Sequence, residues 1–108
     1  MNNEQFSQTR ALITQDFELE NKAENLSEAE LLLLLADQVS YMIEHRMEHL
    51  LSLMYRLDID EAKVNFALSP LSPEPPALGL AKLVLERQKK RILTKSAYKT
   101  PPLDDDAW

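Results

Sequence analysis

The stretch 25-NLSEAELLLLL-35 decides the fold of this 108-residue chain, because it holds both a helix start and the residues that the helix must bury. Ser27 followed by Glu30 forms a capping box. In this motif the serine oxygen accepts from the backbone N–H of the third helical residue, and the glutamate reaches back to the serine N–H. Leu26 and Leu31 can form a hydrophobic staple across the cap. We therefore predict a helix that begins at Ser27.

The predicted helix continues to about Leu57, since neither proline nor glycine interrupts it. Apolar residues recur at steps of three and four, which places them on one helix face. The residues of this stripe are Leu32, Ala36, Val39, Ile43, Met47, Leu50, Met54 and Leu57. The leucines at 31–35, however, point in every direction. A helix that is apolar on all sides must be buried on all sides.

Four apolar side chains lean away from the stripe, namely Leu31, Leu34, Leu35 and Met42. Two other modest helices do not suffice to cover them. We therefore expect these residues to form a partner-binding surface, most simply that of a symmetric homodimer. The alternative is that the N-terminal segment folds back and covers them within one chain.

Two shorter helices are predicted downstream. Asp58, with Glu61 three residues later, is typical of a helix cap and predicts a helix over about 59–68. Prolines dominate the connector 70–76, and the next helix runs over about 76–94. The residues that share one face of this last helix are Ala77, Leu80, Ala81, Val84, Leu85, Gln88 and Ile92.

These elements predict an all-α fold, a small helical bundle with one long central helix (about 27–57) and two or three shorter helices. The single glycine supports this class, because sheets and tight hairpins need more glycine. The predicted organisation is an N-terminal segment over 1–25 with a short helix at about 4–15, a helical domain over 26–95, and an acidic, proline-containing tail over 96–108. Trp108 is a candidate to anchor that tail on a groove. The chain has no cysteine, which excludes disulfides.

The net charge of −6 is unevenly distributed. Residues 1–81 carry a balance of −9, residues 82–99 one of +6, and residues 100–108 one of −3. The default explanation of the basic residues in 82–99 is that positive charge near a helix C-terminus complements the helix dipole. The alternatives are binding of nucleic acid or another anion, or association with the acidic part of a second copy. The anion-binding candidates are Arg87, Lys89, Lys90 and Arg91.

His45, Glu48 and His49 match the H-x-x-E-H pattern of zinc proteases. A catalytic zinc ion needs a third protein ligand and an open cleft, and no further residue is singled out by spacing. On the predicted helix, both histidines fall on the face opposite the apolar stripe. We therefore predict that they are surface residues, and we keep a zinc-dependent hydrolase as an alternative. The expected protein has no cofactor and no catalytic residues.

The sequence also predicts where the protein works. Its longest apolar run, Leu31–Ala36, is shorter than the roughly 18 residues that a membrane span needs. The N-terminus lacks the basic start and apolar run of a secretory signal. We expect a soluble, cytoplasmic, non-enzymatic protein without a membrane partner.

The segments "MYRLDIDEAK" and "LVLERQKKR" resemble parts of small bacterial all-helical proteins of unknown function. The similarity covers residues 38–92. The resemblance implies a compact helical fold in a bacterial cytoplasm, and it supplies no catalytic residues.

Overall fold

The computed structural model describes residues 1–19 and 25–97 of the chain. Within these ranges the chain forms five helices and no strand. The helices are α1 (Asn3–Phe17), α2 (Glu28–His45), α3 (Met47–Arg56), α4 (Glu61–Leu68) and α5 (Pro76–Ala97). The predicted all-α fold is confirmed. Most of the predicted tail, residues 98–108, lies outside the described residues.

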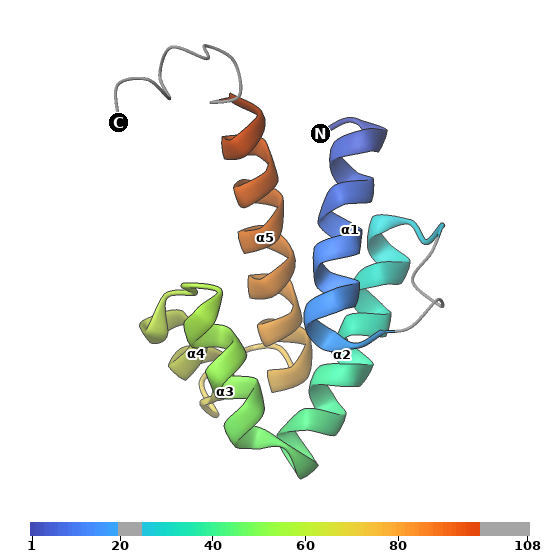
Figure 1. Ribbon diagram of the computed structural model, residues 1–108. Coiled ribbons are helices and arrows are strands. Elements are labelled where there is room, and N and C mark those ends of the chain that lie inside the picture. The colour runs from blue at the N-terminus through green and yellow to red at the C-terminus, as the bar shows by residue number, and fades with distance from the viewer. Residues whose placement is uncertain (20–24, 98–108) are drawn as a thin grey trace.

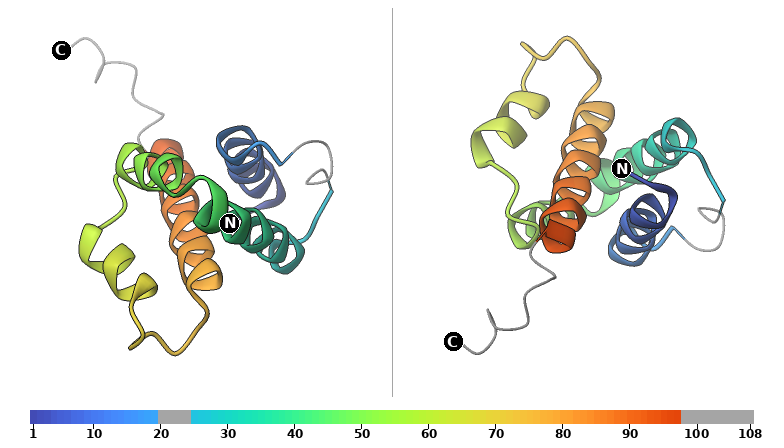
Figure 2. Two further views of the ribbon diagram at one scale, coloured as in Figure 1. Left: turned by 90° about the horizontal axis from the view of Figure 1, so that it is seen from below. Right: turned by 90° about the horizontal axis from the view of Figure 1, so that it is seen from above.

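The helices are arranged around α5. Helix α1 lies beside α5 and runs antiparallel to it, so that the start of α1 and the end of α5 share one end of the molecule (Figure 1). Helix α2 packs against both α1 and α5. Helix α4 contacts α5 on the side away from α1 (Figure 2). The N-terminal helix therefore folds back on α2, which is the alternative that the sequence left open.

Local capping signals account for the starts of the first two helices. The Ser27 N–H donates to Glu30 Oε1 across 2.9 Å, and the Glu30 N–H donates to Ser27 Oγ across 3.2 Å, so the predicted capping box is confirmed. The backbone hydrogen bond from Ser27, followed by the one from its side chain, lowers the pKa of Glu30. Helix α1 has a second capping box, formed by Asn2 and Gln5, which the sequence analysis missed.

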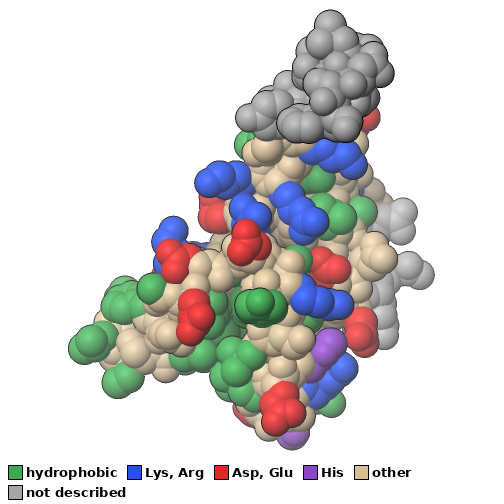
Figure 3. Space-filling view, turned by 60° about the vertical axis from the view of Figure 1, so that its left-hand side comes forward, with side chains coloured by type: hydrophobic (Ala, Val, Ile, Leu, Met, Phe, Trp, Pro, Cys, Tyr) green, Lys and Arg blue, Asp and Glu red, His purple; other side chains and the backbone are tan. Residues whose placement is uncertain are grey.

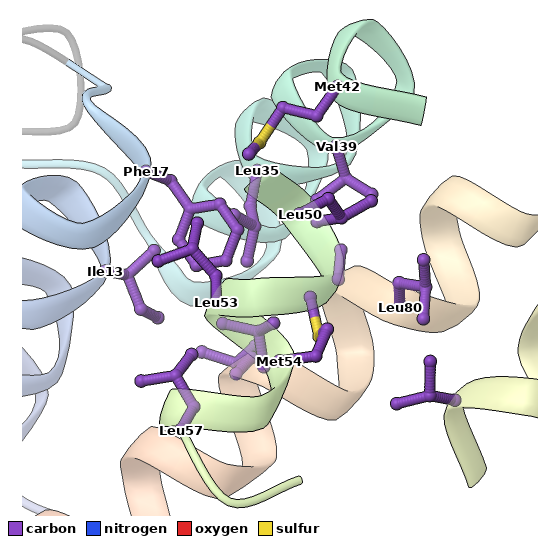
Figure 4. Close-up of a cluster of buried hydrophobic side chains, with 14 of the residues drawn as sticks. Ile13, Phe17, Leu35, Val39, Met42, Leu50, Leu53, Met54, Leu57 and Leu80 are labelled. Atoms are coloured by element: carbon purple, nitrogen blue, oxygen red, sulfur yellow. The ribbon is translucent and has the colours of Figure 1, made fainter. Parts of the chain in front are cut away.

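The long helix predicted over 27–57 is divided at Arg46. This residue has φ −142° and ψ 47°, and its N–H still donates to the Met42 carbonyl oxygen across 2.7 Å. The direction of the chain changes there. As a result, Leu50 and Leu53 of α3 point into the cluster that also holds Phe17 of α1 (Figure 4). We attribute the break to this burial, because neither proline nor glycine lies nearby to cause a kink.

The boundary of α4 also differs from the prediction. Asp60, rather than Asp58, caps this helix, and its side chain accepts from the Ala62 N–H across 2.9 Å. Asp58 instead adopts a left-handed backbone conformation with φ 60°. The chain thus turns at Asp58 before α4 begins at Glu61.

The core confirms one predicted helix face and corrects another. All predicted core-face residues of α5 are buried except Ala77, which is half-buried. On α2 the predicted stripe is only half-buried at Leu32, Ala36 and Ile43. The core face of α2 consists of Val39, which belongs to the predicted stripe, together with Leu31, Leu35 and Met42, which do not. Because leucines surround the start of α2, periodicity alone did not select this face.

Candidate interaction surfaces

Three of the four residues predicted to bind a partner lie in the core. Leu31 and Leu35 are fully buried, Met42 is 1% exposed, and Leu34 is half-buried against the same core. The contacts of α2 with α1 and α5 cover this face within one chain. The prediction of a dimer surface is therefore wrong for Leu31, Leu35 and Met42, because side chains without exposed area cannot contact a second molecule; for Leu34 it stays a prediction.

The histidine segment spans the break between two helices. His45 is the last residue of α2, and His49 lies in α3, so the two do not share one continuous helix face. The ring centroids of His45 and Tyr41 lie 4.8 Å apart, and His45 Nε2 lies 3.7 Å from the Glu44 carboxylate. Within residues 1–19 and 25–97, no three histidine or acidic side chains are grouped as a metal site requires. The structure thus adds no support for the zinc-hydrolase alternative.

The most exposed apolar side chains include two on α4 and the connector that follows it. We call residues 61–75 the α4 lobe. Leu71 is 80% exposed and Phe66 is 50% exposed. Figure 3 shows hydrophobic side chains gathered over this lobe and in the hollow beside it. Neither residue was predicted from the sequence as part of an interaction surface.

A groove of about 400 Å³ runs between the α4 lobe and α5. Its apolar lining includes Phe66, Ala67, Pro73 and Leu83. Gly79 allows the close approach of the two helices, since a Cβ at this position would lie 3.3 Å from the Ala67 Cβ. Charged residues of both signs, Lys63, Glu74 and Lys82, also line the groove, and Lys82 pairs with Glu74.

Two of the four anion-binding candidates have partners inside the fold. Arg87 Nε donates to the Leu57 carbonyl oxygen across 2.9 Å, and its Nη2 lies 3.5 Å from Asp58. Lys89 Nζ donates to the Glu28 carboxylate across 3.1 Å. The hydrogen bond with Glu28 raises the pKa of Lys89, against the opposing effect of desolvation. Arg87 and Lys89 therefore hold helices together in this structure.

The other two candidates, Lys90 and Arg91, are exposed. They line a groove of about 410 Å³ between α1 and α5, which we call the cationic groove. Its lining residues are Leu12, Arg87, Lys90, Arg91, Ile92, Thr94 and Lys95, and none of these described residues is acidic. A second groove of about 850 Å³ shares Arg87, Lys90 and Thr94 with the cationic groove and mixes basic residues with Asp58, Asp60 and Glu86. Arg91 and Lys95 line only the cationic groove, so the positive charge without acidic neighbours in a groove lies in the last turns of α5.

No protein-family model, curated protein or solved structure matches this chain. The resemblance to small bacterial all-helical proteins therefore stays a prediction. No helix in the described ranges combines the length and apolar character needed to cross a lipid bilayer.

Proposed function

We propose that this chain is a non-enzymatic protein-interaction module that associates with a second copy of itself through the α4 lobe. The observation that carries the proposal is the exposure of Leu71 and Phe66 beside an apolar groove. Burying apolar surface stabilises a complex by about 25 cal/mol per Å² before the costs of association. Exposed apolar patches are typical of interaction sites. This surface replaces the one that the sequence predicted on α2.

The α4 lobe favours a second copy because it carries both halves of a contact. Leu71 projects from the lobe, and the groove, whose lining includes Phe66, offers an apolar recess. In a two-fold symmetric interface, the projecting side chain of each copy enters the recess of the other. Lys63, Lys82 and Glu74 supply both signs of charge there, so two identical surfaces need not repel each other.

The alternative function is binding of nucleic acid or another anion through residues 82–99. The cationic groove favours it, since Lys90, Arg91 and Lys95 face the same recess. Two observations count against it. The chain has a net charge of −6, and Arg87 and Lys89 contact groups of the fold. We therefore place self-association first.

The test is sedimentation velocity over a concentration series reaching about 1 mM, where a weak association of about −4 kcal/mol is still populated. We expect the wild type to form dimers and Leu71→Lys to stay monomeric. The matched control is Leu33→Lys, which makes the same substitution at a 64% exposed leucine of α2. Circular dichroism verifies that both variants fold.

Self-association through the α4 lobe is excluded if the wild type stays monomeric throughout the series. It is also excluded if Leu33→Lys weakens the dimer as much as Leu71→Lys does. Phe66→Ser provides an independent variant on the same lobe, and we expect it to weaken the dimer as well.

A further inference from the structure

The cationic groove is a surface whose described lining is basic and contains no acidic side chain. Lys90 and Arg91 lie three and four residues after Arg87, and Lys95 lies four residues after Arg91, so these cations are neighbours on one side of the helix. Arg87 contacts Asp58. Among the ion pairs of residues 1–19 and 25–97, none includes Lys90, Arg91 or Lys95. An anionic occupant would relieve the repulsion among these cations.

The chain itself contains a matching segment. Residues 98–108, YKTPPLDDDAW, follow directly on α5 and lie outside the described residues. They include three consecutive aspartates, Asp104–Asp106, and the only tryptophan of the chain, Trp108. The groove offers cations for the aspartates, and Leu12 and Ile92 as apolar contacts for an indole ring.

We propose that the C-terminal segment 98–108 docks in the cationic groove of its own chain. Asp104–Asp106 pair with Lys90, Arg91 and Lys95, and Trp108 packs against the apolar lining. This inference is independent of the α4 lobe and of self-association.

The length of the tail permits this contact. Helix α5 rises about 1.5 Å per residue, so Arg91 lies about 9 Å back along the axis from the helix end at Ala97. Asp104 lies seven positions after Ala97 in the sequence, and an extended chain of that length spans up to about 23 Å. Tethering also gives the tail an effective concentration of about 1 mM at its groove, which favours it over a dilute competitor.

Trp108 provides the readout, because it is the only fluorescent indole in the protein. We would measure the emission maximum of Trp108 and its quenching by acrylamide in the full-length chain. The protein would carry Leu71→Lys and would be kept at a concentration where sedimentation shows only monomers. We expect a shielded indole. The quenching constant should rise about two-fold from about 0.1 M to about 1 M salt, since the Debye length shortens from about 10 Å to about 3 Å.

Charge reversal identifies the groove. Arg91→Glu with Lys95→Glu should expose Trp108 at low salt. The matched control is Arg46→Glu with Arg56→Glu, which makes the same change in net charge at exposed positions outside the groove and should leave Trp108 shielded. Lysine at positions 104–106 should also expose Trp108. Combining that change with glutamate at positions 90, 91 and 95 should restore the shielding.

Three results would overturn the proposal. The first is equal quenching of Trp108 in the wild type and in the groove variant. The second is shielding that grows with protein concentration, which would place the tail on another copy. The third is binding of inorganic polyphosphate to the groove without any change in Trp108 emission, whereas displacement of Trp108 by polyphosphate would support it. None of these readouts depends on whether the α4 lobe self-associates.

Discussion

Arg87 on α5 donates a hydrogen bond from Nε to the carbonyl oxygen of Leu57, across 2.9 Å and 30 positions of sequence. Leu57 is the C-cap residue of α3, and backbone carbonyls at a helix C-terminus lack helical partners. The same guanidinium lies 3.5 Å from Asp58, the residue with φ 60° at the turn into α4. Arg87 therefore fixes the end of α3 and the turn that follows it, a role that its place in a basic run did not suggest.

We expect Arg87→Ala to lower the free energy of unfolding by about 1.5 kcal/mol, because the hydrogen bond to Leu57 comes from a charged group. We expect the ion pair between Arg87 and Asp58 to contribute little to the free energy of unfolding, because Asp58 is exposed to solvent. Urea denaturation measures the difference. Arg91→Ala is the control and should change the free energy by less than about 0.5 kcal/mol. Equal effects of the two variants would contradict the role assigned to Arg87.

Lys89 connects α5 to the first turn of α2 through Glu28. We expect Lys89→Met to lower the free energy of unfolding at neutral pH by about 0.5 kcal/mol, since Glu28 is half-exposed and solvent screens the pair. The pKa of Lys89 in the folded chain is raised above its ordinary 10.5. The stabilisation is thus fully present below that value and lost as the pH rises through the folded-state pKa.

Urea denaturation at neutral and strongly alkaline pH tests whether the stabilisation by Lys89 is lost as the pH rises. The difference between wild type and Lys89→Met should shrink at high pH, while Lys90→Met should match the wild type at both. A difference that stays constant would show that Lys89 acts through its aliphatic stem instead.

Gln88 is a fully buried polar residue between α5 and α1. Its Nε2 donates to Asp16 across 3.1 Å, and its Oε1 has no hydrogen-bond partner among the described residues. We expect Gln88→Met to leave the free energy of unfolding within about 1 kcal/mol of wild type or to raise it. The gain from removing an unsatisfied buried acceptor offsets the lost hydrogen bond.

Gln88→Glu should have the opposite effect. Burial can raise a carboxyl pKa by about 3 units or more, each worth about 1.36 kcal/mol, so we expect a loss of about 4 kcal/mol at neutral pH. The folded state then holds a proton that the unfolded state has lost, so stability should fall as the pH rises above about 4.3. Urea denaturation at several pH values tests this slope. A loss independent of pH would point to packing alone.

Gly79 sets the distance between α5 and α4. Alanine there would gain about 1 kcal/mol of helix propensity, while its Cβ would press against Ala67 at 3.3 Å. Because α4 is short and joined by turns at both ends, we expect it to shift slightly, so that Gly79→Ala changes the free energy of unfolding by less than about 1 kcal/mol.

Gly79→Leu should instead cost about 2 kcal/mol through overpacking and loosen the α4 lobe. Limited proteolysis within residues 69–75 would then become faster than in the wild type, and Gly79→Ala would serve as the control. Unchanged cleavage in Gly79→Leu would show that this contact does not hold the lobe in place.

Local signals in the sequence predicted the parts of the fold that depend on neighbours within one helical turn. The capping box at Ser27 predicted the start of α2, and spacing at three and four residues predicted the buried face of α5. The same signals did not predict the break at Arg46, because no residue there opposes a helical backbone. Nor did they predict the surface: Leu71 and Leu31 are both leucines, yet one is exposed and the other fully buried.

The sequence by itself therefore determined the helical class, most helix boundaries to within a few residues, and the concentration of positive charge after residue 82. These depend on backbone hydrogen bonds and side chains close together in the chain. Only the tertiary structure decided which side of α2 is buried, where the chain bends, and which cations contact the fold. Those outcomes depend on burial between helices distant in sequence, and a helix surrounded by leucines fits more than one such arrangement equally well.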